Sequence, residues 1–315
     1  MDLRSLRYFA EVAVTQNLSR AAAKLHRSQP ALSRCIQELE AELGLDLFER
    51  VGRGLVLTSN GRALRERVHA LLADADALVE QARLLASGKT AVLRIGGPLN
   101  FIECVLPDVL RAYRADHPEV EISLAPEGGT ATLAALERGE IDVAVTRYVD
   151  RPFLEARLGF PVYVFAAIPA THRLAGVDRL VVEQLQSERL LVAPETATSR
   201  MLFESACQDV GMRPRFGLES HDYNGLVALA AAEQGIAIIP STVRTSVRGI
   251  FVRPIFHRAN PLATWAAIVW NRRRASPPHL QGFIDCASGR LKAGFPGSGL
   301  GLPPPQLEAF GDVRA

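Results

Sequence analysis

Residues 3–14 place apolar side chains at every third or fourth position, which predicts an amphipathic helix. A short helix follows over about 19–25, and another over 28–44 carries a second apolar stripe. Pro30 lies in the first turn of that third helix, where backbone amides have no intrahelical acceptor. The pattern predicts two helices joined by a very short turn, after a first helix on which both can pack.

The pattern changes over residues 47–58, where two short apolar runs flank Gly52-Arg53-Gly54 and predict a β-hairpin. A long helix over 59–87 follows, with apolar positions spaced alternately by four and three residues, as in a coiled coil. Because a lone helix would leave this seam in water, we expect a partner helix to cover it. The residues assigned to this dimerisation seam are Leu64, Val68, Leu71, Leu78 and Leu85.

From about residue 91 onward, short apolar runs alternate with helical patterns, which predicts an α/β fold with a parallel sheet and right-handed crossovers. The expected strands are 92–97, 120–126, 141–146, 162–168, 190–194, 236–240 and 265–270. Residues 289–315 match no such pattern. The Gly- and Pro-rich stretch 294–305 within them predicts a disordered tail.

The composition of the chain mainly argues against particular kinds of site and protein class. The net charge of the 315 residues is only +2, so a nucleic-acid surface would have to be local. The four cysteines are far apart and the seven histidines are scattered, which predicts neither a disulfide framework nor a metal site. No catalytic motif, signal segment or membrane-length apolar run is present. We expect a cytoplasmic protein that is not an enzyme and needs no cofactor.

The start of the third helix carries small and polar residues ahead of its apolar stripe. A helix that enters the DNA major groove contacts bases with its N-terminal residues, where Gln pairs with adenine and Arg with guanine. Arg50 and Arg53 on the hairpin could reach phosphates or the minor groove. A plain three-helix bundle with a solvated polar face would give the same pattern, and helix spacing alone leaves both open. The residues of this reading edge are Ser28, Gln29, Pro30, Ser33 and Arg34.

Several segments together resemble a known family. LRYFAEVA, NLSRAAAKLHRSQPALSRCIQELEAELGLDLFER and LTSNG resemble the winged helix-turn-helix of LysR-type transcriptional regulators. The resemblance continues through LRIG, LERGEIDVAV, THRLA and GIAIIP to about residue 288, with Glu233 where the family usually has glycine. In that family, the positions that match the reading edge from Gln29 onward approach bases, and those that match Arg50 and Arg53 meet the backbone or minor groove.

The resemblance also implies a division of the chain. A winged helix-turn-helix domain would be followed by a linker helix and an effector-binding domain of two α/β subdomains, similar to periplasmic binding proteins. Two crossing strands, near Pro161–Tyr163 and Thr264–Ala266, would join the subdomains. The expected bounds are 1–58, 59–88 and 91–288, with subdomain 1 over 91–161 and 266–288, subdomain 2 over 162–265, and the tail over 289–315.

A small effector would lie in the cleft between the subdomains. In open α/β sheets, ligands bind beyond the carboxyl ends of the strands, where helix N-termini point. Hydroxyl and amide groups there suit a carboxylate, although ordinary helix capping explains the same residues. This rule selects Pro98, Leu99, Asn100, Thr130, Thr198 and Ser199.

The sequence thus predicts a DNA-binding regulator switched by a small molecule of unknown identity. The implied partners are double-stranded DNA, that effector, and further copies of the chain in a homodimer or homotetramer. RNA polymerase is a further possibility, and no membrane is involved. Two other classes remain open at this point: a solute-binding module with an accessory helical domain, and an α/β enzyme with a helical dimerisation domain.

Overall fold

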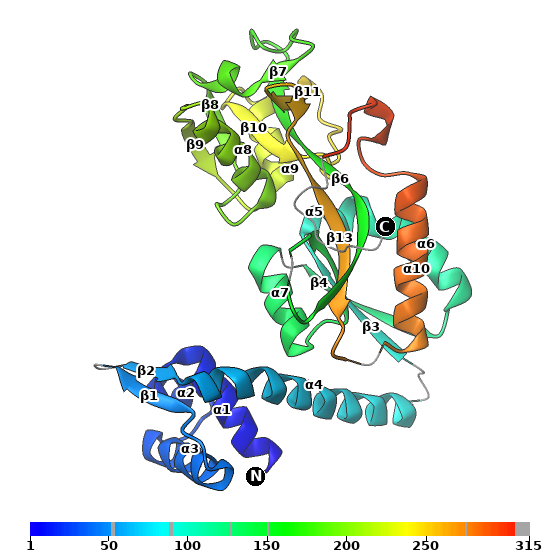
Figure 1. Cartoon of the computed structure of the whole chain (residues 1–315). Helices are drawn as coiled ribbons and strands as arrows, with labels where there is room; N and C mark the ends of the chain where they lie inside the picture. Colours follow the sequence, from blue (N-terminus) through cyan, green and yellow to red (C-terminus); the bar gives the residue numbers. More distant parts are fainter. Residues whose placement is uncertain (52–53, 88–90, 127, 150, 275, 306–315) are drawn as a thin grey trace. The chain divides into compact units, whose positions relative to one another are not determined.

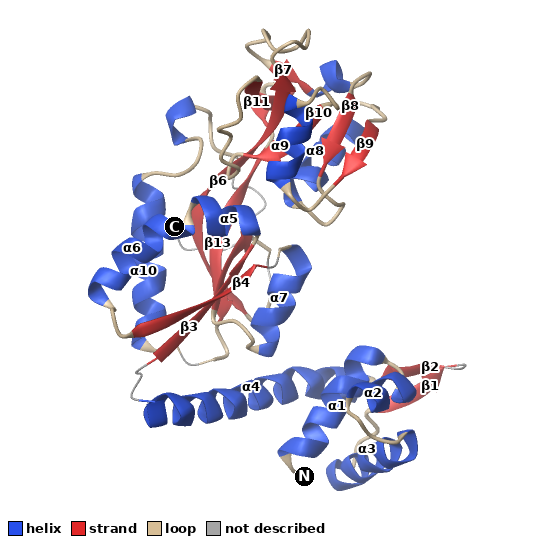
Figure 2. Cartoon of the chain, turned by 180° about the vertical axis from the view of Figure 1, so that it is seen from behind, coloured by secondary structure: helices blue, strands red, loops and turns tan. Residues whose placement is uncertain are grey.

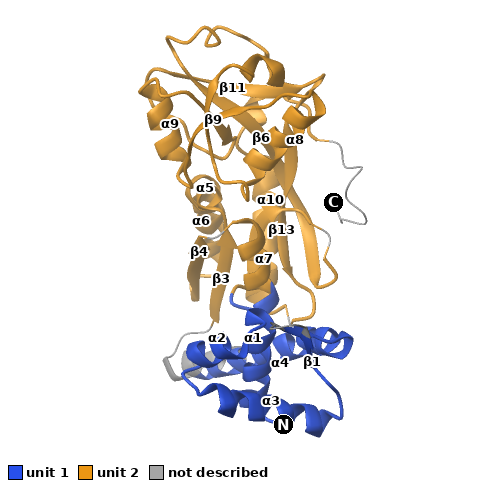
Figure 3. Ribbon diagram, turned by 90° about the vertical axis from the view of Figure 1, so that its left-hand side faces the viewer, with its two compact units in different colours: residues 1–89, 137–140 blue, residues 90–136, 141–315 orange. Residues whose placement is uncertain are grey.

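The computed structural model describes residues 1–305 except 52–53, 88–90, 127, 150 and 275 (Figure 1). The chain forms two compact units, coloured separately in Figure 3. Unit 1 comprises residues 1–89 with 137–140, and unit 2 comprises 90–136 and 141–315.

Unit 1 contains the expected helices and hairpin. Its elements are α1 (Leu3–Thr15), α2 (Leu18–Lys24), α3 (Gln29–Leu43), β1 (Phe48–Val51), β2 (Gly54–Leu57) and α4 (Ser59–Ser87). The apolar stripes of α1 and α3 meet in one core, where Phe9, Val12 and Leu32 have no exposed surface. The helical spacing of the sequence therefore becomes a shared core.

The turn between α2 and α3 is tight because the end of α2 closes on itself. The Arg27 amide donates to the Ala22 carbonyl and the His26 amide to the Ala23 carbonyl, the hydrogen-bond pattern of a Schellman motif. His26 takes the left-handed backbone conformation that this motif requires, with φ 52°. At the other end, Asn17 caps α2 through its side chain, so the helix begins slightly before the predicted residue 19.

The hairpin and α4 are joined through Thr58 and Gly61. The Thr58 hydroxyl donates to the Asp46 carbonyl at 2.7 Å and accepts from the Gly61 amide at 3.0 Å. A Cβ on Gly61 would lie 2.1 Å from the Leu47 carbonyl oxygen, so only glycine lets α4 start this close to the hairpin.

The described strands of unit 2 form one sheet of eleven (Figures 1 and 2), whose main order is β4-β3-β5-β13-β6-β10-β8-β9. The bounds are β3 (Ala91–Gly97), β4 (Val120–Pro126), β5 (Val143–Arg147), β6 (Leu154–Pro169), β7 (Leu180–Val181), β8 (Arg189–Val192), β9 (Arg215–Glu219), β10 (Ile236–Pro240), β11 (Ile250–His257), β12 (Asn260–Pro261) and β13 (Ala263–Asn271).

The sheet is mixed, so the expectation of a parallel sheet is only partly correct. The pairs β3–β4, β3–β5, β10–β8 and β8–β9 are parallel. In contrast, β6 and β13 run antiparallel to each other along most of their lengths. These two strands pass from one half of the sheet to the other, and the pairing of Val162 with Thr264 lies where both crossings were expected.

Helices cover the sheet. They are α5 (Leu99–Cys104), α6 (Leu106–Asp116), α7 (Gly129–Arg138), α8 (Thr198–Asp209), α9 (Tyr223–Ala231) and α10 (Pro278–Ala293), with 3₁₀ turns at Val182–Leu185 and Ser298–Leu300. One half of the sheet packs against α6 and α10, and the other against α8 and α9. We call these halves subdomains 1 and 2.

The C-terminal boundary needs correction. Helix α10 continues to Ala293, beyond the domain limit expected at 288. Residues 294–305, expected to be disordered, pack on the sheet because Phe295 and Leu302 supply apolar side chains between the glycines and prolines. Residues 306–315 lie outside the described part of the chain.

Candidate nucleic-acid interface and ligand pocket

The reading edge lies at the N-terminus of α3. Ser28, Gln29, Pro30 and Arg34 are exposed, and Ser33 is half-buried. Ser28 occupies the N-cap position, but its side chain makes no capping hydrogen bond. Within the part of the chain that the structure describes, Gln29 and Arg34 have no side-chain hydrogen bond or ion pair either. Their donor and acceptor groups are available to an external ligand.

The opposite face of α3 explains why this edge points outward. Leu32, Ile36 and Leu39 are at most 5% exposed and pack against α1 and α2. Because side chains three and four residues apart share one helix face, burial of this stripe turns the polar residues of the first turn toward solvent. The apolar stripe therefore orients the reading edge.

Of the two hairpin arginines predicted to contact DNA, the structure describes one. Arg50 is exposed on β1, where it pairs with Leu55 on β2. Arg53 lies at the turn, outside the described residues.

Helix α4 divides the predicted dimerisation seam into two parts. Val68 is 3% exposed inside the core of unit 1, and Leu64 packs against the same core. Val68 is therefore held by its own domain and offers no surface to a partner chain, whereas Leu64 is half-buried and its place in the seam stays a prediction. Leu71 and Leu78 are 46% and 68% exposed, so their side chains remain accessible to a partner helix. The side chain of Leu85 lies outside the described residues.

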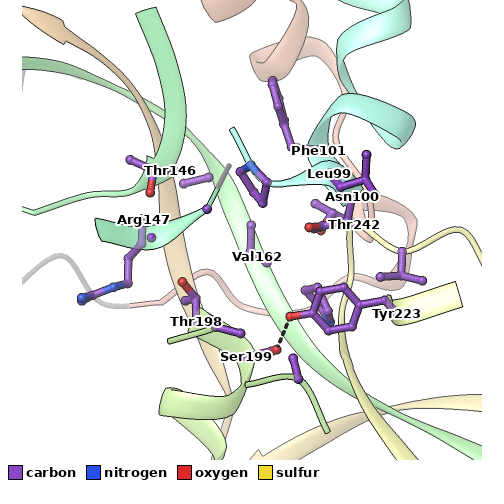
Figure 4. Close-up of a pocket in the computed structure, with 18 of the residues that line it drawn as sticks. Leu99, Asn100, Phe101, Thr146, Arg147, Val162, Thr198, Ser199, Tyr223 and Thr242 are labelled. Carbon is purple, nitrogen blue, oxygen red and sulfur yellow. Dashed lines mark hydrogen bonds between the residues drawn. The ribbon is translucent and has the colours of Figure 1, made fainter. Parts of the chain in front are cut away.

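Unit 2 contains a pocket of about 680 Å³ between its two subdomains. This volume is within the usual range for small-molecule sites. Figure 4 shows side chains from both subdomains around it. All six residues selected from the sequence line this pocket: Pro98, Leu99, Asn100, Thr130, Thr198 and Ser199.

Hydrogen bonds order the polar side chains of the pocket. The Ser199 and Tyr223 hydroxyls form a hydrogen bond at 2.8 Å (Figure 4), and burial raises the pKa of Tyr223, which keeps its phenol group neutral. The Asn100 amide donates to the Thr242 hydroxyl across the subdomain boundary. Asn100 and Ser199 thus already have partners from the chain itself, and these bonds fix the pocket wall.

The charged residues of the pocket differ in their partners. Glu103 accepts from the Asn224 amide at 3.3 Å, and Asp222 caps α9 by accepting from the Asn224 backbone. Arg147 is half-buried, and the described residues give its guanidinium no hydrogen bond or ion pair. Helices α7 and α8 also begin at this pocket, so their N-terminal partial positive charge adds to that of Arg147.

Sequence reasoning missed Thr146 and Arg147, although a signal was present. They are the last two residues of β5, and the rule about strand carboxyl ends applies to β5 as it does to β3. Trp265 and Tyr223 carried no comparable signal, because their place in the pocket depends on how β13 and α9 lie against the other subdomain.

The described residues contain no cluster of three or more His, Cys, Asp or Glu side chains placed to hold a metal ion. None of the helices that the structure describes is long and apolar enough to span a membrane.

A helix-turn-helix with an unpartnered reading edge, on the same chain as a two-subdomain α/β unit with a pocket, defines a class: transcription regulators that carry their own ligand-binding domain. Residues 3–62 match the family model of the bacterial regulatory helix-turn-helix protein, lysR family. Residues 86–292 match the LysR substrate binding domain. The chain belongs to the LysR family of transcriptional regulators.

Individual relatives agree with this assignment. The transcriptional regulator IlvR of Caulobacter vibrioides is 32% identical over 90% of this chain and 96% of its own. XapR of Escherichia coli, another transcriptional regulator, is 30% identical over 82% of this chain and 88% of its own. A crystal structure of full-length BenM is 26% identical, with a TM-score of 0.56 over 97% of this chain and 99% of that one. The relatives are named as regulators rather than enzymes.

Proposed function

We propose that this regulator reads its DNA sites with the N-terminal end of α3 and changes its action when a small anionic molecule occupies the pocket of unit 2. The observation that carries the proposal is the exposed N-terminal end of α3, where the Gln29 and Arg34 side chains have no partner among the described residues. Two reading helices in a dimer predict a roughly two-fold symmetric site. Such a protein acts in the cytoplasm.

The first test identifies the site. Genomic fragments retained by the purified full-length protein are sequenced and aligned. A shared two-fold symmetric motif is expected; no enrichment at low salt would contradict DNA reading and would favour the solute-binding alternative.

The second test assigns the readers by comparing Gln29→Ala with Arg50→Ala on that site. Gln29→Ala is expected to cost about 1–3 kcal/mol on the best site and to relax preference at one base pair. Arg50→Ala is expected to weaken all sequences alike and to lower the slope of log affinity against log salt by about 0.9. If Gln29→Ala weakened every sequence equally, Gln29 would not be a base reader.

We infer that the effector is a carboxylate. The support is Arg147 together with the N-termini of α7 and α8 at the pocket, since both favour a negative charge. Apolar side chains such as Val162, Phe160 and Trp265 line the remaining wall and suit an apolar body.

The ligand class is tested by thermal shift with a panel of aliphatic and aromatic carboxylates, each paired with its neutral amide. A carboxylate at 100 times its Kd stabilises the fold by about 2.7 kcal/mol, whereas the paired amide is expected to give no shift. Arg147→Met should remove most of the difference between the pair. Equal shifts from acid and amide would contradict the inference.

A further inference from the structure

The segment after α10, residues 294–305, lies where the two subdomains meet. We call this segment the strap. It follows subdomain 1, because α10 packs against α6 and the core of that subdomain. Its contacts then involve β6 and β13, the two strands that pass between the subdomains.

Phe295 ties the strap to both subdomains. Its ring stacks on Phe160, with centroids 6.1 Å apart and planes at 24°. The same side chain packs against the apolar core of subdomain 1 and against a core cluster of subdomain 2, which Leu302 also contacts. A single half-buried side chain therefore touches both bodies whose separation sets the width of the pocket.

Two hydrogen bonds hold the rest of the strap. The Tyr163 hydroxyl on β6 donates to the Leu302 carbonyl at 3.0 Å, and the Trp265 indole N–H on β13 donates to the Pro305 carbonyl at 3.0 Å. Tyr163 is 2% exposed, so its hydroxyl finds a partner here that water cannot readily replace. Both donors lie on the crossing strands, near the points where the strands change subdomain.

The path of the strap beside β6 uses the backbone freedom of Gly297. Its φ is +93°, a conformation that residues with a side chain rarely adopt, and it lies in contact with the Tyr163 ring. The glycines that suggested disorder in the sequence include one that fits the strap onto the crossing strands.

The strap also contacts the pocket wall from outside. Phe160 and Trp265 line the pocket, and these are the residues that meet Phe295 and the Pro305 carbonyl. We propose that the strap is a third link between the subdomains and acts as a positioning element. It limits how far the subdomains open and so sets the width of the pocket that is available to a ligand. Only the identity of that ligand rests on the proposed function; the link itself does not.

The physical argument concerns the number of connections. Two strands crossing between two bodies permit hinge closure and opening about the crossing points. A third connection that packs on both strands at the crossing points, as the strap does through Phe160, Tyr163 and Trp265, stiffens this hinge, because bending there would break its contacts. Removal of the strap should therefore be felt at the pocket lips as well as at Phe160, Tyr163 and Trp265, which the strap contacts directly. A strap that only covers apolar surface would affect just the residues beneath it.

Hydrogen exchange of the full-length protein, without DNA or ligand, distinguishes these two roles. The variants are a chain that ends at Ala293 and Phe295→Ala. Phe295→Tyr serves as the conservative rescue, and Leu300→Ala as a matched control in the same segment, since Leu300 is 55% exposed. The diagnostic peptides cover 98–104, 128–131 and 196–199, on the lips of the pocket.

Exchange at the lip peptides is expected to be about tenfold faster in the shortened chain and several-fold faster in Phe295→Ala. Phe295→Tyr and Leu300→Ala should match the unaltered protein. Faster exchange confined to residues that touch the strap, with unchanged lips, would overturn the proposal. If the shortened chain fails to fold, Phe295→Ala and Tyr163→Phe still decide between the outcomes.

The outcome is independent of the proposed function. If exchange at the lips is faster but the protein enriches no DNA motif, the role of the strap is supported and the proposed regulator function is contradicted. If a motif is enriched but exchange at the lips is unchanged, the regulator function is supported and the role of the strap is contradicted.

Discussion

At the scale of single residues, three of the described helices end at a left-handed residue that is not glycine: Gln16, His26 and Glu233. Glu233 ends α9 with φ 60°, its amide donating to the Ala230 carbonyl and the Gln234 amide to the Leu229 carbonyl. This is the Schellman pattern, in which glycine is the usual residue at the position of Glu233. The resemblance to the family had marked this position as a departure, and the backbone explains why glycine is common there.

Glu233→Gly is expected to be more stable than Glu233→Ala by about 1 kcal/mol, because a Cβ in this conformation costs about 1–2 kcal/mol. Both variants lose the hydrogen bond from the Thr171 hydroxyl to Glu233, so their comparison isolates the backbone effect. Urea unfolding monitored by circular dichroism measures the difference. Equal midpoints for the two variants would show that the strain has been relieved elsewhere.

Cys207 is a second single residue with a testable property: its burial makes it a poor redox sensor. It is 1% exposed, and burial raises the pKa of its thiol to about 12. Since the thiolate is the reactive form, native protein at pH 8 should hold Cys207 unreactive toward a disulfide reagent. The rapidly titrated thiols of the native protein and of Cys207→Ser should therefore be equal in number, with the difference appearing only after unfolding. One fewer rapid thiol in Cys207→Ser would contradict this.

At the scale of elements, α4 performs two tasks along one helix. Its first turns are anchored in the winged helix-turn-helix core through Val68, whereas Leu71 and Leu78 remain exposed. The heptad spacing in the sequence could not separate these tasks. An apolar residue in a regular seam can face its own domain or a partner, and only the position of α1 and α3 decides which.

Leu78→Asp is expected to lower the mass of the oligomer in sedimentation while leaving the fold of unit 1 intact. Val68→Ala should instead cost about 2 kcal/mol of stability through loss of core packing, with the mass unchanged. Leu71→Asp should behave like Leu78→Asp. A normal mass for both aspartate variants would exclude this face of α4 as the dimer contact.

Most elements were predicted within a few residues, and the exceptions have physical reasons. Strand β11 was missed because Pro254 interrupts its apolar run, and a proline normally argues against a strand interior. Strand β9 was missed because it lies at the end of the sheet and carries Gly217, with little alternation of buried and exposed residues. The antiparallel β6–β13 pair changed the sheet from parallel to mixed, since pairing partners far apart in sequence leave no local pattern.

At the scale of the whole molecule, regulation requires that the ligand distinguish between two arrangements of the protein. A ligand with equal affinity for both would shift nothing, however tightly it bound. In the function proposed above, closure of the pocket between the subdomains would supply two such arrangements, and a change in dimer packing would carry the difference to the DNA.

Thr130→Ala, at the start of α7 in the pocket, is expected to reduce the change in operator affinity that a bound carboxylate causes. Operator affinity without ligand should remain the same, since the substitution lies outside the reading edge. Fluorescence anisotropy with labelled operator, with and without a carboxylate identified by thermal shift, measures both quantities. A loss of affinity in the absence of ligand would contradict this separation.

The sequence by itself determined the architecture of this protein and many of its important positions. Helical and strand periodicities, the polar start of α3 and the residues after β3 follow from local rules about which side chains face a core and which follow a strand. Those rules act over a few residues, so the printed sequence contains them in full. The family resemblance added the order of the domains and further support for the proposed reading role of Gln29 and its neighbours.

The tertiary structure alone decided how distant segments use those positions. It placed Val68 in its own core, joined Ser199 to Tyr223 in the pocket wall, and turned a Gly- and Pro-rich tail into a strap held by Phe295. Each outcome depends on contacts between segments far apart in the chain. Burial and hydrogen bonding at such contacts are settled by packing in three dimensions, which local composition does not encode.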